Sequence, residues 1–178
     1  LSSLLATGKP VIFVLMTGSA VGLEWEDRHV PAIVNAWYGG QAGGDAVADV
    51  IFGDYNPAGR LPVTFYRSVA DLPDFEDYSM EGRTYRYFRG KPVYAFGHGL
   101  SYTDFNYSDL RISRLGDGSL KVTVKVTNSG ERDGDEVVQL YISNDRKFRT
   151  PIRSLKGFDR ISLKAGESMD VVFTMAPD

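Results

Sequence analysis

Three carboxylates stand close together at Glu24, Glu26 and Asp27, and their chemistry could define a site. Glycoside hydrolysis requires two carboxyl groups, one that donates a proton and one that acts as nucleophile or base. Neighbours in sequence seldom reach a substrate from both sides, whereas acidic residues are common in the first turn of a helix. We therefore expect this cluster to begin a solvated helix, with a catalytic pair as the alternative.

A glycine-rich turn at 39–44 lies between an apolar run and a helical pattern. It lacks both the Gly-Lys-Ser/Thr of a phosphate-binding loop and the spaced glycines of a dinucleotide site, so we interpret it as a tight turn. Ligands of open α/β sheets nonetheless bind at the carboxyl ends of the strands. Trp37, Tyr38 and Gln41 lie at such an end, and we predict that they bind substrate. The alternative is that the two rings are core residues.

Four arginines, Arg60, Arg83, Arg86 and Arg89, lie near or among tyrosines. They could together bind an anion. Alternating arginine and tyrosine side chains more often form a packed seam through cation–π contacts, because the guanidinium stacks on the ring face. We expect such a structural seam.

Other kinds of site lack the residues they need. The chain has no cysteine, which excludes disulfides, thiolate zinc sites and a cysteine nucleophile. No serine sits in a Gly-x-Ser-x-Gly elbow, and His29 and His98 have no ligand-like spacing, so we predict no metal and no cofactor. A net charge of −3 argues against nucleic acid, and no apolar run approaches the roughly 18 residues that span a membrane.

The beginning of the chain alternates apolar runs of strand length with a helical pattern. Continuous β-branched runs are typical of central parallel strands that are covered on both faces. In the helical pattern Ala46, Val47, Val50 and Ile51 form a narrow apolar stripe. The predicted elements are a helix end at 1–7, strands at 11–16 and 32–37, a helix at 45–52 and a short edge strand at 61–65.

Regular periodicity is lost between 67 and 105, where aromatic residues are dense. So many large rings are not left in water, because exposed apolar patches of that size are rare on soluble proteins. We therefore expect an ordered connector packed on a partner surface. Its rings are Tyr78, Tyr85, Tyr87, Phe88, Tyr94, Phe96, Tyr102 and Phe105.

From 106 onward the hydrophobic period becomes two. Val122, Val124 and Val126 alternate with polar residues, so these valines should face inward. Turn sequences separate further alternating runs, which favours an immunoglobulin-like, antiparallel β-sandwich. About five strands can be counted where a complete sandwich of this type has about seven, and we expect the domain to be truncated.

Five motifs follow one another along the chain: GKPV at 8–11, WYGGQAGGDAVADVIFGD at 37–54, NPAGRLP at 56–62, GRTYRYF at 82–88 and PVYAFGHGLSYTDF at 92–105. They resemble the motifs of glycoside hydrolase family 3. In their order and spacing they are specific, and the resemblance covers essentially the whole sequence. Ala95 and His98 stand where the family usually has proline and tyrosine.

The resemblance implies a larger enzyme with an N-terminal (β/α)8 barrel, an open α/β sandwich domain and a fibronectin type III-like β-sandwich. This chain would hold the later part of the α/β domain at 1–66, the connector at 67–105 and the truncated third domain at 106–178. Family members are retaining, exo-acting enzymes that release terminal β-linked glucose or xylose. Their catalytic aspartate lies in the barrel and their acid/base glutamate upstream of Leu1, so no residue here is assigned a catalytic role.

The resemblance also implies a secreted or periplasmic protein whose partners are a β-linked oligosaccharide or glycoside and the upstream barrel. The run at 83–88 favours the β-xylosidase-like branch, while the choice between glucoside and xyloside stays open. We expect this chain alone to be inactive and to supply scaffold and part of a pocket wall. The alternative is a non-catalytic carbohydrate-binding or adhesion module.

Overall fold

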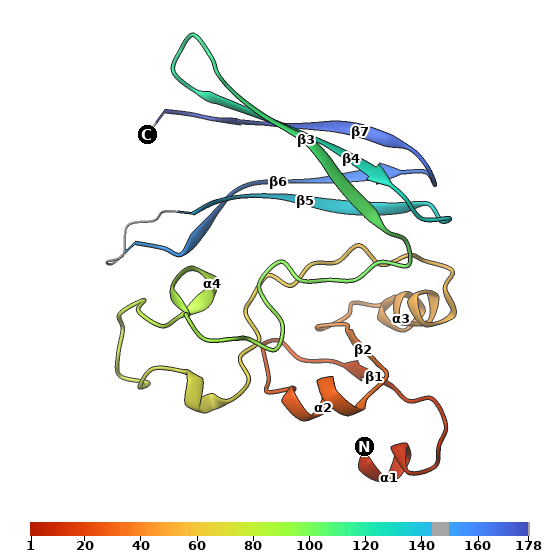
Figure 1. Cartoon of the computed structure of the whole chain (residues 1–178). Coiled ribbons are helices and arrows are strands. Elements are labelled where there is room, and N and C mark those ends of the chain that lie inside the picture. The colour runs from red at the N-terminus through yellow and green to blue at the C-terminus, as the bar shows by residue number, and fades with distance from the viewer. Residues whose placement is uncertain (144–149, 178) are drawn as a thin grey trace. The chain divides into compact units, whose positions relative to one another are not determined.

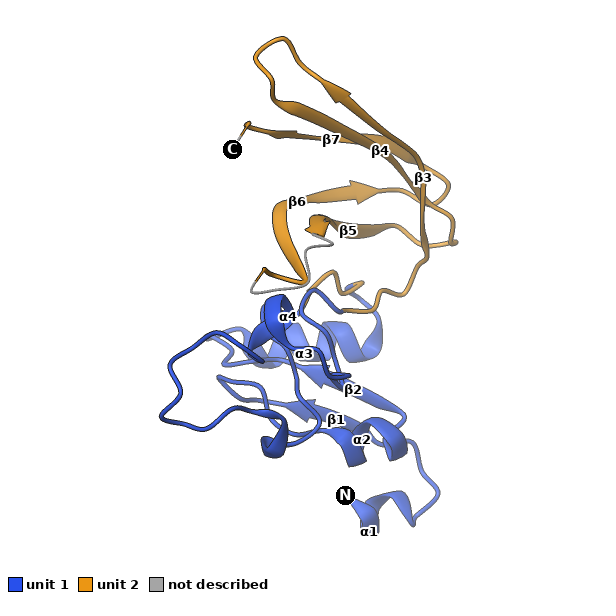
Figure 2. Cartoon of the chain, turned by 60° about the vertical axis from the view of Figure 1, so that its left-hand side comes forward, with its two compact units in different colours: residues 1–55, 61–98 blue, residues 56–60, 99–178 orange. Residues whose placement is uncertain are grey.

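The computed structural model describes residues 1–143 and 150–177 (Figure 1). Their contacts divide the chain into two compact units, one made of Leu1–Tyr55 with Leu61–His98 and the other of Asn56–Arg60 with Gly99–Asp178 (Figure 2). Most of the stretch expected to be a connector thus belongs to the first unit. The division into domains at 1–66, 67–105 and 106–178 stays a prediction.

The first unit contains a parallel pair of strands, β1 (Ile12–Leu15) and β2 (Ala32–Asn35). Ile12 pairs with Ala32 and Leu15 with Asn35, so the two strands end at the same edge. Helix α2 (Glu24–His29) connects them, as a parallel pair requires. The two predicted strands are confirmed: β1 is one residue shorter at each end than predicted, and β2 is two residues shorter at its carboxyl end.

The longest helix of the first unit is α3, which follows the glycine-rich turn. Val47, Val50 and Ile51 are partly buried as predicted, whereas Ala46 is exposed. Gly53 ends the helix with a φ of 84°, a conformation that costs glycine little. The helical segments of this unit besides α2 are α1 (Ser2–Leu5), α3 (Gly43–Phe52), η1 (Val69–Asp71) and α4 (Thr84–Tyr87).

The predicted edge strand at 61–65 is wrong, because these residues make an isolated bridge instead of a strand. The N–H of Phe65 donates to the carbonyl of Tyr94 at 2.9 Å, and the N–H of Leu61 donates to the carbonyl of His98 at 2.8 Å. Between them Pro62 has no N–H to donate, so a regular ladder cannot continue. The pairing of the two segments is therefore real but irregular.

Aromatic rings pack on one another within the first unit. Phe65 is 1% exposed, with Tyr94 edge-on at a centroid distance of 6.3 Å. Tyr85 stacks on Phe96 at 4.2 Å, and Phe88 meets another ring, Tyr66, edge-on at 4.8 Å. The expectation that the dense rings are packed holds for these residues. It is wrong for Tyr78, whose side chain is 91% exposed.

The second unit is an antiparallel β-structure whose described strands form two sheets, ordered β3-β4-β7 and β5-β6. The described residues thus contain the five strands that the alternating pattern predicts. The strands are β3 (Phe105–Arg114), β4 (Leu120–Asn128), β5 (Gly134–Ser143), β6 (Arg153–Leu163) and β7 (Ser168–Met175).

The core of this unit takes residues from both sheets. Val126 on β4 is fully buried, and Val122 is 3% exposed, while Val124 packs at the margin of the core. The alternation predicted for β4 is therefore confirmed. The buried cluster consists of Val126, Val138, Ile161, Leu163 and Val171.

A five-residue segment, 56–60, belongs to the second unit although the next 38 residues do not. Oδ1 of Asn56 accepts hydrogen bonds from the hydroxyl of Ser101 at 3.0 Å and the N–H of Tyr102 at 2.7 Å. Its Nδ2 donates to the carbonyl of Asp133 at 3.0 Å. One amide side chain thus joins three separate segments of the chain.

The same segment carries Arg60, which forms a buried ion pair with Glu136 on β5. The guanidinium lies 2.6 Å from Oε2 of Glu136, and the two side chains are only 12% and 11% exposed. The other carboxylate oxygen accepts a hydrogen bond from the hydroxyl of Tyr107 at 2.9 Å. Burial foremost, and then the charge of Glu136, raise the pKa of Tyr107, so this hydroxyl stays a donor.

The buried pair gives a first prediction. Arg60→Met should lower the free energy of unfolding of the protein by about 2–4 kcal/mol, because a carboxylate is left buried without its cation. Arg111→Met is the matched control, since Arg111 pairs with Asp170 at the surface and an exposed pair contributes at most about 1 kcal/mol. Urea unfolding followed by circular dichroism measures both, and equal losses would contradict the prediction.

Candidate functional site

The carboxyl ends of β1 and β2 meet at one edge of the parallel pair. The N–H of Ala36, just after β2, donates to the carbonyl of Leu15 at the end of β1 at 2.9 Å. Trp37 follows with a φ of 52°, which is unusual for a bulky residue and is found where the surrounding structure imposes a conformation. Its ring is half-buried, and its centroid lies 6.2 Å from that of Phe65. The alternative interpretation, that Trp37 is a core residue, is therefore correct in part.

Tyr38 and Gln41 lie in the open at the same edge. The side chain of Tyr38 is 76% exposed, which excludes a core role in this structure. Its ring covers Gly18 in the loop after β1, where a Cβ atom would come within 2.7 Å of the ring. Tyr38 thus connects the loops that follow both strands. Sequence reasoning missed Gly18, whose neighbours Thr17 and Ser19 mark it only as part of a loop.

Asn35, the last residue of β2, is a polar residue that the sequence did not single out. Its Oδ1 and Nδ2 atoms are both buried, and neither has a hydrogen-bond partner among the described residues. The hydroxyl of Thr64 is in the same condition. Because an unpaired buried polar group costs about 1–3 kcal/mol, such groups mark positions whose surroundings matter. One of them, Asn35, stands at the carboxyl end of β2.

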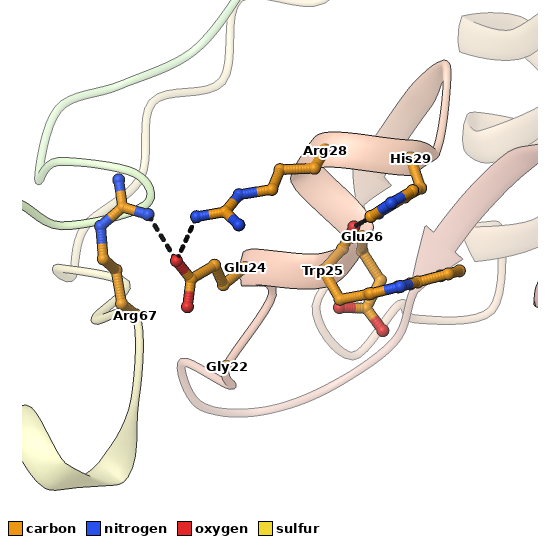
Figure 3. Close-up of a pocket in the computed structure, with 7 residues that line it drawn as sticks. All are labelled: Gly22, Glu24, Trp25, Glu26, Arg28, His29 and Arg67. Carbon is orange, nitrogen blue, oxygen red and sulfur yellow. Dashed lines mark hydrogen bonds and ion pairs between the residues drawn. The ribbon is translucent and has the colours of Figure 1, made fainter.

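A second candidate site is an open hollow beside α2, with a volume of about 410 Å³ (Figure 3). Both Arg28 and Arg67 point toward Glu24, whose Oε1 lies 2.6 Å and 2.9 Å from their guanidinium groups. The lining residues are Gly22, Glu24, Trp25, Glu26, Arg28, His29 and Arg67.

Glu24 therefore acts as a structural anion. Two guanidinium groups already occupy its carboxylate, and Arg67 also donates through Nε to the carbonyl of Lys91 at 3.1 Å. Glu24 thus holds α2 to Arg67, which in turn contacts the segment at Lys91. The interpretation of the acidic cluster as the first turn of a helix is confirmed, since Glu24, Glu26 and Asp27 lie in the first turn of α2.

The three carboxylates do not converge on one point. Asp27 accepts a hydrogen bond from the hydroxyl of Tyr94; burial foremost, and then Asp27, raise the pKa of that hydroxyl. Trp25 stacks on His29 with ring centroids 4.5 Å apart, and Nδ1 of His29 lies 2.7 Å from the carbonyl of Trp25. The side chains of α2 thus make separate structural contacts, and the arrangement provides no carboxylate pair across a substrate.

The expected arginine–tyrosine seam is wrong as a single feature. Arg60 belongs to the second unit, while Arg83 donates to three backbone carbonyls of its own loop. Arg86 lies 5.6 Å from the ring centroid of Tyr87, a cation–π contact, and Arg89 is exposed. The partners of these arginines depend on loop conformation, which the spacing of residues does not predict.

Two further findings concern the described residues only. Their His, Asp and Glu side chains form no group of three that could hold a metal ion. Within the same residues, none of the helices has the length and apolar content needed to cross a membrane.

The ion-pair cluster at α2 gives a second prediction. Glu24→Gln should lower the free energy of unfolding by about 0.5–1.5 kcal/mol, because two part-exposed ion pairs are lost. Glu26→Gln is the control, since Glu26 lines the same hollow outside the cluster, and it should change stability by less than about 0.5 kcal/mol. Raising the salt concentration should shrink the difference between the variants, and a salt-independent difference would speak against this role.

Sequence comparison places the chain among known enzymes. A xylan 1,4-β-xylosidase from Xylanibacter ruminicola is 52% identical over 169 residues, which are 94% of this chain and 20% of that protein. A periplasmic β-glucosidase from Salmonella typhimurium is 42% identical over 97% of this chain and 25% of its own length. The chain thus spans about a fifth to a quarter of these relatives.

Solved structures agree with the fold. β-Glucosidase 3B from Thermotoga neapolitana in complex with α-D-glucose superposes with a TM-score of 0.87 at 36% identity, covering 98% of this chain and 27% of that one. DesR, a β-glucosidase from Streptomyces venezuelae in complex with D-glucose, gives a TM-score of 0.86 at 38% identity, covering 97% of this chain and 24% of its own.

Two family models match the chain. The fibronectin type III-like domain matches residues 136–178, within the β-structure of the second unit. The C-terminal domain of glycosyl hydrolase family 3 matches residues 1–102, which are more than half of the sequence. This chain therefore belongs to glycosyl hydrolase family 3, as a C-terminal portion that joins an α/β part to a fibronectin type III-like part.

Proposed function

We propose that the chain is the C-terminal portion of a retaining, exo-acting β-glycosidase that removes terminal β-linked glucose or xylose from oligosaccharides or glycosides. The observation that carries this proposal is the likeness over nearly the whole chain to β-xylosidases and β-glucosidases, in both sequence and fold. A separate sugar-binding or adhesion module is not favoured, because the relatives that match both parts of the chain are named as hydrolases.

Retention of configuration requires two carboxyl groups about 5–5.5 Å apart, one as nucleophile and one as acid and then base. In this chain Glu24 is occupied by arginines and Asp27 by Tyr94, so neither is free for that work. In the proposed enzyme the catalytic pair comes from residues preceding this chain, including a barrel domain. This segment is proposed to support the catalytic geometry, because two carboxyl groups work together only when the surrounding structure keeps them at the required distance.

Within this segment, the carboxyl edge of β1 and β2 is proposed to form part of the pocket wall. Tyr38 offers an exposed ring face and Gln41 an exposed amide, and these can contact the apolar face and the hydroxyl groups of a sugar. The proposed role of Trp37 is to position both, because its ring is held against Phe65 while its backbone turns the loop outward.

Sugar preference and location are parts of the same proposal. The higher identity to the Xylanibacter xylosidase than to the Salmonella glucosidase supports a preference for xylosides. The name of the Salmonella relative, a periplasmic enzyme, supports a secreted or periplasmic location.

The third prediction concerns activity. The full-length protein should hydrolyse nitrophenyl β-xyloside and β-glucoside, with the xyloside giving the higher kcat/KM and the first-formed sugar keeping the β configuration in NMR. This 178-residue chain should give no turnover above background, because the carboxylates of α2 form no pair across a substrate. Turnover by the isolated chain would contradict the assignment, and so would an inverted product.

The fourth prediction concerns the pocket wall. In the full-length protein, Tyr38→Ala and Gln41→Ala should each raise KM about three- to tenfold and keep kcat within about twofold, because a binding contact is lost without change in the chemistry. Phe52→Ala is the control, since this exposed ring lies at the other end of α3 and should leave KM unchanged. An unchanged KM in both site variants would remove these residues from the pocket.

A further inference from the structure

The loop between η1 and α4 exposes two aromatic rings that no element of the first unit covers. Phe75 is 94% exposed and Tyr78 is 91% exposed. Rings of this size bury large areas in most proteins, so two nearly bare rings three residues apart are unusual. The candidate site at the β1–β2 edge does not include them.

This loop is held in shape by its own contacts. Arg83 donates through Nε to the carbonyl of Ser79 at 3.2 Å and through one terminal nitrogen to the carbonyls of Asp74 at 3.1 Å and Asp77 at 2.6 Å. The N–H of Ser79 donates to the carboxylate of Asp77 at 2.8 Å. The bare rings therefore project from a fixed loop, and a fixed surface binds with a smaller loss of entropy than a mobile one.

The loop that carries the rings is rich in carboxylates. Asp74, Glu76, Asp77 and Glu81 lie in the loop, and no lysine or arginine occurs between 68 and 82. Hydrogen bonds from the backbone and then the side chain of Ser79 lower the pKa of Asp77, so this group stays an acceptor. Acidic polymers are excluded by repulsion, and the dry centre of a protein interface is depleted in such charges because their burial is costly.

A neutral sugar chain has the complementary chemistry. Its C–H faces can stack on the rings while its hydroxyl groups donate to the carboxylates, which remain hydrated at the margin. We propose that Phe75 and Tyr78 form a second sugar-binding surface, which contacts units of a β-linked oligosaccharide beyond the one that is cleaved. This inference rests on the proposed glycosidase function for its ligand class.

The test uses the full-length protein and substrates of increasing length. Phe75→Ala, Tyr78→Ala and the double variant are compared with Phe158→Ala, an exposed ring on β6 outside the loop. The kcat/KM for nitrophenyl β-xyloside should stay within twofold of the wild type. For xylohexaose or cellohexaose, kcat/KM should fall about three- to tenfold for each ring removed, because KM rises. A change of this size corresponds to the loss of one aromatic contact.

Binding provides a readout that does not depend on hydrolysis. In calorimetric titration with the same hexasaccharides, the double variant should bind more weakly than the wild type and than Phe158→Ala. Equal losses on the aryl glycoside and the hexasaccharide, together with a lower melting temperature, would show that another part of the protein covers the rings and would overturn the inference. Unchanged KM and affinity at every length would overturn it as well.

The two proposals fail in different ways. A wild-type protein that hydrolyses neither aryl glycoside contradicts the proposed function. An active wild type whose ring variants behave like Phe158→Ala contradicts only the second sugar-binding surface.

Discussion

A buried charge has to be neutralised where it lies, and in the second unit this constraint fixes the path of the chain. Glu136 is placed inside by the alternation of β5, and its carboxylate needs a cation there. Arg60 supplies it from a segment 76 residues earlier in sequence. Asn56 fastens the other end of that segment with three hydrogen bonds. The β-structure thus incorporates five residues of a chain that then leaves it for the first unit.

Local patterns predicted the parts of the fold that local physics decides. The β-branched run before Thr17 and the alternating valines of β4 became strands because each pattern matches one sheet environment. The predicted edge strand at 61–65 failed at Pro62, whose missing N–H interrupts a pairing that does occur around it. The prediction that Tyr78 is packed failed for another reason. A high density of aromatic residues in a segment does not show which of their side chains face the solvent.

The candidate site likewise contains residues that local rules predict and residues that only the fold reveals. The rule that ligands meet the carboxyl ends of strands led to Trp37, Tyr38 and Gln41, and the structure places all three at that edge. The ion pair between Glu24 and Arg67 joins residues 43 apart, and the loop contacts of Arg83 depend on backbone direction. Neither could be found from spacing, because each requires the path of the chain in space. Asn35 looked like an ordinary polar residue until its burial was known.

Gly99 has a consequence for how the length of the chain between 61 and 98 can change. A side chain at this position would meet the carbonyl oxygen of Gly59 within 2.1 Å, so the chain returns to the second unit almost where it left it. Residues 61–98 therefore form a long excursion of the chain whose two ends lie close together. Because the entropy of closing a loop grows only slowly with its length, a change of length within 61–98 costs little at the point where the chain leaves and rejoins the second unit.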